Sequence, residues 1–195
     1  MPLEFITGPV RSGKSRFAEQ CARETRGDVV YVATAAIDAD DRQWQRRIER
    51  HVAHRPPSWK LVETARAGAP PLASILREAT AQQTLLIDSL GTWLAHQMSV
   101  RFDGGGEAAA CDEDGLQAEI DGVVTAARRC VGRAIVVGEE VGWGLVPEYP
   151  SGRVFRDVMG RAHQDLARAA ARAYLVVAGY AIDLKAAREV DFGFR

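Results

Sequence analysis

Cysteine and long apolar runs are scarce in this sequence, and each shortage excludes a class of protein. Its three cysteines, Cys21, Cys111 and Cys130, are widely spaced and include no Cys-x-x-Cys pair, which argues against a disulfide framework and a zinc site. No apolar stretch approaches the roughly 20 residues of a membrane-spanning helix, and the first residues lack the basic and apolar regions of a signal peptide. We therefore expect a cytoplasmic protein without a membrane span.

A strong excess of charge of either sign is also missing. The formal net charge is −1, from 25 basic and 26 acidic residues, whereas nucleic-acid-binding domains usually carry a clear basic excess. Nucleic acid is therefore not an expected partner. The length of 195 residues suits one sizeable core and is short for two, so we expect a single domain over residues 1–195.

A phosphate-binding motif stands near the start of the chain. The stretch GPVRSGKS, residues 8–15, follows the pattern G-x-x-x-x-G-K-[ST]. In such a loop, backbone N–H groups surround phosphate oxygens, the lysine (Lys14) adds positive charge and the final hydroxyl (Ser15) holds Mg²⁺. An apolar run precedes the loop and a helical pattern follows it, and this order directs the N-terminus of a helix at an anion. The motif therefore predicts nucleotide binding.

Apolar β-branched runs alternate with helical patterns along the whole chain. The helical patterns are clearest over Leu72–Ala79 and Leu116–Ala127, where apolar residues recur three and four positions apart. Strands separated by helices need crossover connections and form a mostly parallel sheet that is covered on both faces. The sequence thus predicts an α/β, three-layer P-loop NTPase fold, with an exposed connection at 101–115 and a tail at 186–195. The expected strands are Leu3–Thr7, Asp28–Thr34, Trp59–Glu63, Thr84–Leu90, Arg133–Val137 and Tyr174–Gly179.

Asp88 directly follows an apolar run that is predicted to be a buried strand. P-loop proteins hold Mg²⁺ with a carboxylate at such a strand end, opposite the hydroxyl of the loop. Ser15 and Asp88 are therefore the predicted metal-binding pair. The alternative is that Asp88 only caps the helix that is expected to begin near Gly91.

His51 is a candidate nucleophile. It shares one face of a predicted helix with Trp44 and Ile48, and Pro56 ends that helix. Neutral imidazole is available near pH 7 and can attack phosphorus to form a covalent intermediate. The residues alone leave two alternatives open, a structural His51 and a nucleophilic His54.

Six stretches together resemble a known family. In chain order they read GPVRSGKS, YVATAA, RIERHVAHRPPSWKLVET, LLIDSLGTWL, EEVGWGLVPE and RVFRDVMGRAHQDLA, and they span about Leu3–Lys185. The P-loop is shared with many unrelated proteins, but the blocks R-I-x-x-H-x-x-x-R-P-x-x-W and E-V-G-x-G-x-V-P are specific. On these motifs the chain resembles the bifunctional adenosylcobinamide kinase and adenosylcobinamide-phosphate guanylyltransferase of cobalamin biosynthesis.

This resemblance implies a Mg²⁺-dependent transferase with GTP and ATP as substrates. Such an enzyme phosphorylates the aminopropanol hydroxyl of adenosylcobinamide and then transfers GMP from GTP to adenosylcobinamide phosphate through a guanylylated histidine. The histidine of the family aligns with His51 and not with His54. The resemblance also implies a homotrimer.

The same resemblance implies the residues of the site. The expected catalytic residues are His51 and Lys14, and the expected metal-binding residues are Ser15 and Asp88. The carboxylate of Glu63 can accept from both guanine N1–H and the 2-amino group. The expected nucleotide-binding residues are Gly8, Pro9, Val10, Arg11, Ser12, Gly13, Lys14, Ser15, Ala33, Thr34, Ala35, Val52, Ala53, His54, Arg55, Glu63 and Asp88.

Two positions depart from the family pattern, because Glu139 and His163 stand where asparagine is usual. Both lie in the second half of the chain, so we expect them to bear on the corrinoid side and the kinase step. Two other functions stay open on the residues alone. One is a small-molecule or nucleotide P-loop kinase without guanylyltransfer, and the other is a P-loop regulator or ATPase subunit without an acceptor.

Overall fold

The structure is a computed structural model that describes residues 3–25, 27–36, 55–102 and 112–190. In this part of the chain, one seven-stranded sheet has the order β3-β2-β4-β5-β1-β6-β7. Neighbouring strands are parallel except β6 and β7, which are antiparallel. The strands are β1 (Leu3–Gly8), β2 (Asp28–Ala33), β3 (Lys60–Glu63), β4 (Gln83–Asp88), β5 (Arg133–Glu139), β6 (Arg172–Val177) and β7 (Tyr180–Asp183).

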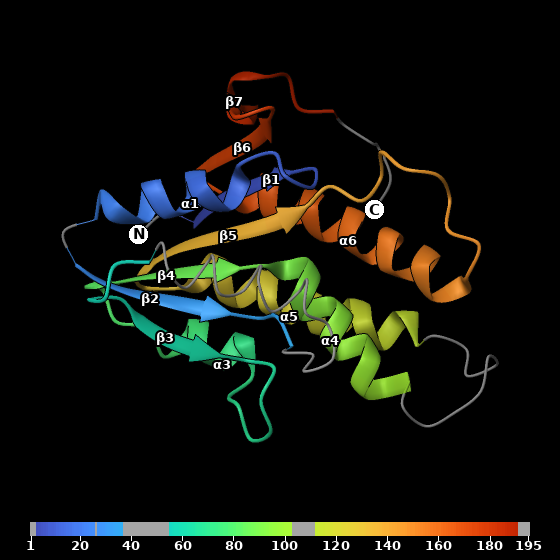
Figure 1. Ribbon diagram of the computed structural model, residues 1–195, viewed down its shortest axis with the longest axis horizontal. Helices are drawn as coiled ribbons and strands as arrows, with labels where there is room; N and C mark the ends of the chain where they lie inside the picture. Colours follow the sequence, from blue (N-terminus) through green and yellow to red (C-terminus); the bar gives the residue numbers. More distant parts are fainter. Residues whose placement is uncertain (1–2, 26, 37–54, 103–111, 191–195) are drawn as a thin grey trace.

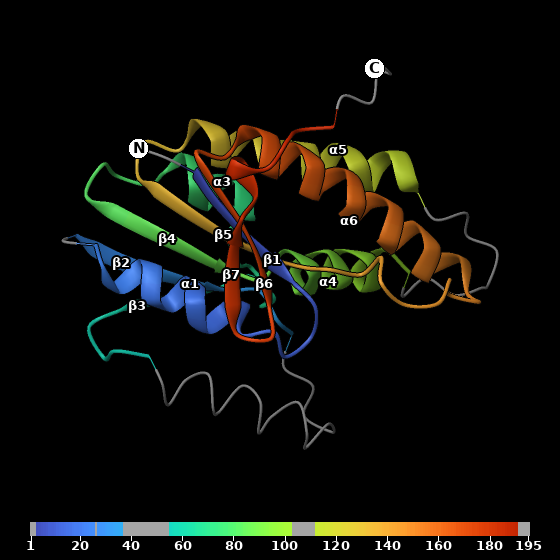
Figure 2. The same cartoon turned by 90° about the horizontal axis from the view of Figure 1, so that it is seen from above.

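Helices cover both faces of the sheet (Figures 1 and 2). Helix α1 (Lys14–Arg23) packs on one face, where Ala18 and Ala22 lie against Ile6 and Val137. The opposite face is covered by α3 (Leu72–Arg77), α4 (Leu90–Phe102), α5 (Glu113–Arg129) and α6 (Pro150–Ala169). Because both faces are buried, the central strands are almost continuously apolar. The predicted three-layer α/β fold is confirmed.

Several expectations about element bounds were wrong. The strand expected at Thr84–Leu90 ends at Asp88, and Leu90 already begins α4. Strand β7 was missed because all four of its residues are exposed, so no alternation of buried and exposed positions marks it. The connection expected at 101–115 is narrower, since α4 continues through Phe102 and α5 begins at Glu113. Arg101 forms ion pairs with Asp112 and Glu119, which favours the longer helices at this point.

The strand directions bring several chain segments to one edge of the sheet. Ala33 at the end of β2 is in register with both Glu63 of β3 and Asp88 of β4. Gly8 at the end of β1 is in register with Glu139 of β5. Open α/β sheets bind ligands outside the carboxyl ends of their strands, and this edge is therefore where a ligand site is expected.

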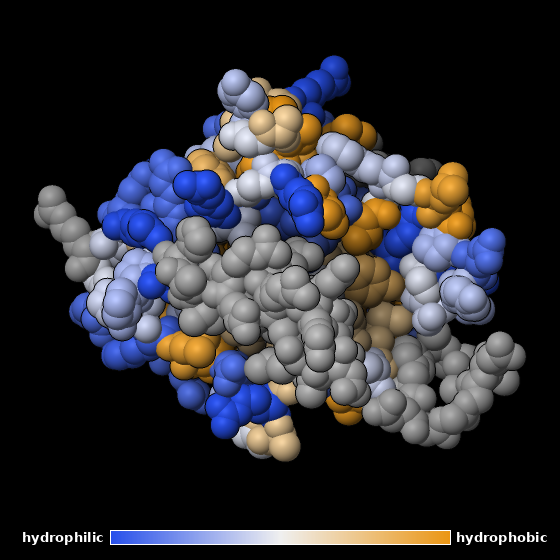
Figure 3. All heavy atoms as spheres, in the orientation of Figure 1, coloured by the Kyte–Doolittle hydropathy of each residue, from blue (hydrophilic) through white to orange (hydrophobic). Residues whose placement is uncertain are grey.

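The surface near this edge differs from the rest of the visible face. Apolar side chains gather over the loop between β5 and α6, at the right of Figure 3, where Leu145 is 95% and Val146 71% exposed. Hydrophilic side chains gather over α1, at the left of the same view. Among the helices that the structure describes, none is both long enough and apolar enough to cross a membrane.

Candidate nucleotide site

The phosphate-binding loop connects β1 to α1, as its motif predicts. Gly13 has a φ of 99°, in the left-handed region that glycine adopts without strain. Its carbonyl accepts from Phe17 N at 2.9 Å and so begins the helix. Gly8 has no room for a side chain, because a Cβ there would lie 2.3 Å from the carbonyl oxygen of Val176. The backbone of this loop thus requires both glycines.

The turn between β6 and β7 supports the loop from the other side, and sequence reasoning missed this contact. Gly179 N donates to the carbonyl oxygen of Ser12 at 2.9 Å. A Cβ on Gly13 would lie 3.7 Å from the Cα of Gly179, so the two segments are close. The available signal was Gly179 itself, which has a φ of 84° and marks a turn after β6.

Lys14 is the first residue of α1 and lies within the protein, with 5% of its surface exposed. Its ammonium donates to the carbonyl oxygen of Pro9 at 3.3 Å, across the width of the loop. The positive charge therefore lies inside the loop, beside the helix N-terminus. Both features favour a bound anion such as a phosphate.

Ser15 and Asp88 are brought together although they lie 73 residues apart, and Ser15 Oγ donates to Asp88 Oδ1 at 3.2 Å. Two oxygen ligands side by side suit Mg²⁺, which is usually held by one or two protein oxygens plus phosphates and water. The donor set therefore fits the ion. Asp88 accepts no bond from the amides of α4 among the described residues, so the helix-cap alternative is wrong.

Tyr31 holds the other oxygen of the same carboxylate. Its hydroxyl donates to Asp88 Oδ2 at 2.7 Å, and the residue is 2% exposed. Burial and the Asp88 charge raise the pKa of Tyr31 well above its ordinary value, so the phenol stays protonated and donates. The Arg55 guanidinium lies 3.5 Å from the centre of the Tyr31 ring, a cation–π contact. Arg55, Tyr31 and Asp88 therefore form one connected group.

Thr34 and Glu63 are two further residues of the expected site, and they differ in burial. Thr34 is fully buried, and its hydroxyl donates to the carbonyl oxygen of Ser89 and accepts from Ser89 N. Its side chain thus connects the end of β2 to the residue after Asp88, and its backbone N–H donates to the carbonyl oxygen of Asp88 at 3.4 Å. Glu63 lies at the same edge, with 30% of its side chain exposed, and pairs with Arg66. Its carboxylate is accessible from solvent.

Glu139 and His163 make internal contacts. The Glu139 carboxylate accepts from Ser89 Oγ and, at 3.0 Å, from Gly91 N, so it caps the start of α4. His163 is buried on α6, with its ring centre 5.1 Å from that of Phe5. A direct contact with a large substrate is therefore not evident for either residue.

Four of the expected site residues, His51, Val52, Ala53 and His54, lie outside the described residues. Arg55 is the first described residue after them. Their predicted roles stay predictions.

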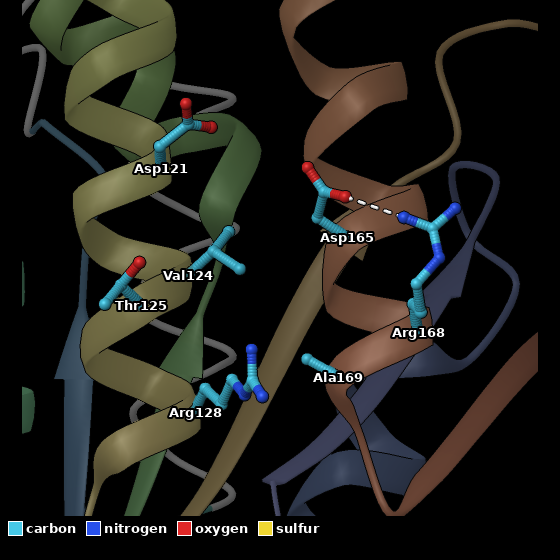
Figure 4. Close-up of a pocket in the computed structure, with 7 residues that line it drawn as sticks. All are labelled: Asp121, Val124, Thr125, Arg128, Asp165, Arg168 and Ala169. Atoms are coloured by element: carbon cyan, nitrogen blue, oxygen red, sulfur yellow. Dashed lines mark hydrogen bonds and ion pairs between the residues drawn. The ribbon is translucent and has the colours of Figure 1, made fainter. Parts of the chain in front are cut away.

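A groove lies between α5 and α6, in the helical layer that covers one face of the sheet (Figure 4). Residues of α5 and of the last turns of α6 line it. The chain that follows α6 bonds to the start of β1, through Ala171 N and the carbonyl oxygen of Leu3, so the groove lies toward the amino ends of the strands. Its acidic and basic side chains balance, and Arg168 pairs with Asp165 across one helix turn. This groove therefore lacks the positive charge of the phosphate loop.

Comparison with known proteins identifies relatives over nearly the whole chain. A family model described as cobinamide kinase / cobinamide phosphate guanyltransferase matches residues 4–184. The bifunctional adenosylcobalamin biosynthesis protein CobU of Escherichia coli (strain K12) is 34% identical over 188 residues, covering 93% of this chain and 98% of that protein. The bifunctional adenosylcobalamin biosynthesis protein CobP of Pseudomonas aeruginosa is 36% identical over 184 residues, covering 93% and 96% respectively.

Solved structures share the fold at low sequence identity. A prototypical ATPase from the type III secretion system of pathogenic bacteria is 12% identical, with a TM-score of 0.54 over 89% of this chain and 50% of that chain. The ATPase EscN of enteropathogenic E. coli is 13% identical, with a TM-score of 0.52 over 91% and 43%. Because the family model spans most of the sequence and both relatives align over nearly their whole length, the chain belongs to the cobinamide kinase / cobinamide phosphate guanyltransferase family.

Proposed function

We propose that the protein catalyses two successive reactions of adenosylcobalamin biosynthesis. The first is phosphorylation of the aminopropanol hydroxyl of adenosylcobinamide by a nucleoside triphosphate, GTP or ATP. The second is transfer of GMP from GTP to the new phosphate, which gives adenosylcobinamide-GDP. The observation that carries this proposal is the phosphate loop with its adjoining Ser15–Asp88 pair, in a chain of this family.

The residues of the loop have separate tasks in both reactions. Backbone N–H groups of residues 8–13 and the start of α1 bind the phosphates, and Lys14 offsets the negative charge that develops on them. Ser15 and Asp88 hold Mg²⁺, which supplies charge neutralisation for the phosphate oxygens when it is bound. Tyr31 keeps Asp88 in one orientation through its hydrogen bond.

We also propose that His51 carries GMP between the two substrates. An imidazole nitrogen attacks the α-phosphorus of GTP, an N–P bond forms and pyrophosphate leaves. The phosphate of adenosylcobinamide phosphate then attacks the same phosphorus, and the histidine leaves. Arg55 follows His51 by four residues in the sequence, and its guanidinium lies over the ring of Tyr31, whose hydroxyl donates to Asp88.

The proposal also covers the oligomeric state, the cellular location and the contact with the guanine base. We infer that the protein is a homotrimer in the cytoplasm. We also infer that the accessible carboxylate of Glu63, at the end of β3, accepts hydrogen bonds from the guanine base of GTP. Sedimentation velocity tests the oligomeric state directly. Glu63→Gln tests the base contact, since it should weaken GTP binding more than ATP binding.

Labelling with GTP tests the central part of the proposal. The protein is incubated with α-labelled and, separately, γ-labelled GTP, in the presence of adenosylcobinamide. Transfer of both labels to the corrinoid supports the bifunctional reaction. Transfer of the γ-label alone indicates a kinase without guanylyltransfer, and hydrolysis without transfer indicates an ATPase or regulator.

Variants of the two histidines then locate the covalent intermediate. His51→Ala should lose the covalent α-label and GMP transfer yet retain phosphorylation of adenosylcobinamide, whereas His54→Ala should still be labelled. The label should be acid-labile and alkali-stable, as a phosphoramidate is. Undiminished labelling of His51→Ala, or loss of label only in His54→Ala, would refute the assignment.

A further inference from the structure

Glu140 follows β5 directly, at the edge of the sheet that carries the nucleotide site. Strand β5 lies between β4, which ends at Asp88, and β1, which ends at Gly8. Glu140 N donates to the carbonyl oxygen of Gly8 at 3.1 Å, so the residue is joined to the first residue of the phosphate loop. The backbone of Glu140 is therefore joined to the phosphate loop, at the end of the sheet where the triphosphate is expected to bind.

The two carboxylate oxygens of Glu140 have different hydrogen-bond partners. Thr7 Oγ1 donates to Oε1 at 2.9 Å, and His163 Nδ1 lies 3.3 Å from the same oxygen. Within the part of the chain that the structure describes, Oε2 has no hydrogen-bond partner. The side chain keeps 22% of its surface exposed. Oε1 is thus held by hydrogen bonds within the protein, and Oε2 can accept a hydrogen bond from a bound molecule.

The hydrogen bonds to Oε1 also affect the pKa of the Glu140 carboxyl group. The hydrogen bond with His163 lowers the pKa of Glu140, burial opposes this effect, and the bond from Thr7 adds to the lowering. The side chain is therefore a carboxylate at neutral pH. His163 is itself buried with its ring against Phe5, so the surrounding atoms limit how far the ring can turn.

The neighbouring carboxylate, Glu139, offers a contrast. Its Oε1 accepts from Ser89 Oγ and its Oε2 accepts from Gly91 N, so both oxygens are engaged at the start of α4. Of the two successive glutamates, only Glu140 has an oxygen without a hydrogen-bond partner among the residues that the structure describes.

We propose that Glu140 is a catalytic residue of the kinase step, in which its Oε2 accepts the proton of the acceptor hydroxyl. As the alcohol oxygen attacks the γ-phosphorus, the new O–P bond forms and the bond from that phosphorus to the β–γ bridging oxygen breaks. The nucleoside diphosphate leaves, and the proton passes from the alcohol to the carboxylate and then to water. Thr7 and His163 are positioning residues that hold Oε1.

This role distinguishes the two reactions of the proposed function, on which the inference rests. The acceptor of the kinase step is an alcohol, which must lose a proton as it attacks. The acceptor of the guanylyltransfer step is a phosphate group, which is already ionised at neutral pH. A base beside the phosphate loop is therefore needed in the first reaction and has no task in the second.

Glu140→Gln tests the inference, because it removes the base and keeps the shape of the side chain. Phosphorylation of adenosylcobinamide by γ-labelled nucleotide should slow by about 10²- to 10⁴-fold. Transfer of GMP to supplied adenosylcobinamide phosphate should stay within about twofold of wild type, measured on the same protein sample. GMP transfer also reports whether the variant is folded, and Glu140→Asp, which keeps a carboxylate, should recover part of the kinase rate.

Glu139→Gln is the matched control, since it makes the same change at the next residue and should leave the ratio of the two rates unchanged. A wild-type kinase rate in Glu140→Gln, or an equal loss of both rates, would overturn the inference. If the wild-type protein itself phosphorylates no adenosylcobinamide, the proposed function fails instead, before any variant is compared.

His163 variants test the positioning role. His163→Asn keeps a side-chain donor that can reach Glu140 and should preserve the ratio of kinase to GMP-transfer rates. His163→Leu removes the donor and should lower kcat of the kinase step while leaving KM for the nucleotide and the GMP-transfer rate unchanged. A parallel fall of both rates in His163→Leu would indicate a purely structural role.

Discussion

Replacing Tyr31 by Phe removes one buried oxygen atom and tests how Asp88 is held. The phenol donates to Asp88 Oδ2 at 2.7 Å, while the hydroxyl of Ser15 donates to Oδ1. The phenylalanine ring keeps the packing of β2 and the contact with Arg55. Net hydrogen bonds to charged groups contribute about 1.5–3 kcal/mol. Because Asp88 is only partly buried and water can replace the phenol, we expect a loss of about 1–2 kcal/mol in unfolding free energy.

Two measurements follow from this loss. For a chain of this size, 1 kcal/mol corresponds to about 2–4 °C in Tm, so calorimetry should show a decrease of about 2–8 °C. A freed Asp88 side chain must also be ordered again when the ion binds, at a cost of about 0.5–1.5 kcal/mol. The Mg²⁺ concentration that half-saturates binding of a fluorescent GTP analogue should therefore rise by about 2- to 10-fold.

Tyr174→Phe is the matched control. This tyrosine lies on β6 with its ring against Phe17, and within the described residues its hydroxyl has no hydrogen-bond partner. Its removal should change neither Tm nor the Mg²⁺ dependence. If Tyr31→Phe behaves like Tyr174→Phe in both assays, the hydroxyl does not hold Asp88 and the reasoning is refuted.

Three other perturbations have defined outcomes. Lys14→Ala should depress kinase and guanylyltransfer rates together, because both reactions need a triphosphate in the same loop; full guanylyltransfer would mean that another site serves that step. Gly8→Ala places a Cβ 2.3 Å from the carbonyl oxygen of Val176 and should lower the unfolding free energy by about 1–3 kcal/mol in a urea titration; wild-type stability would contradict the tight packing. The folded-state pKa of Glu140 lies below its ordinary 4.5, mainly through the bond with His163, so its contribution to stability is present above pH 4.5 and is lost as the pH falls further. Wild-type stability should therefore approach that of Glu140→Gln below pH 4.5, and a constant difference down to pH 2 would contradict the lowered pKa.

Much of the architecture was predictable because its causes are local. The phosphate loop is specified within eight successive residues, whose glycines, lysine and serine act at fixed spacings. The strands of the sheet centre are apolar runs because helices cover both of their sides. The position of Asp88 at a strand end, beside the hydroxyl of Ser15, was predictable for the same reason, since it directly follows such a run. The prediction needed only the order of elements and no knowledge of contacts.

Other features depend on residues that meet only in the folded chain. The bond from Thr7 to Glu140 spans 133 residues, and the one from Tyr31 to Asp88 spans 57. A periodic pattern reports which side of an element is buried but not which partner lies opposite, so these pairs had no signal in the sequence. The same applies to strand β7, whose exposed residues show no pattern. The strand order places β5 between β4 and β1, and only the folded contacts distinguish the two successive glutamates, since within the described residues both oxygens of Glu139 are bonded but only one oxygen of Glu140 is.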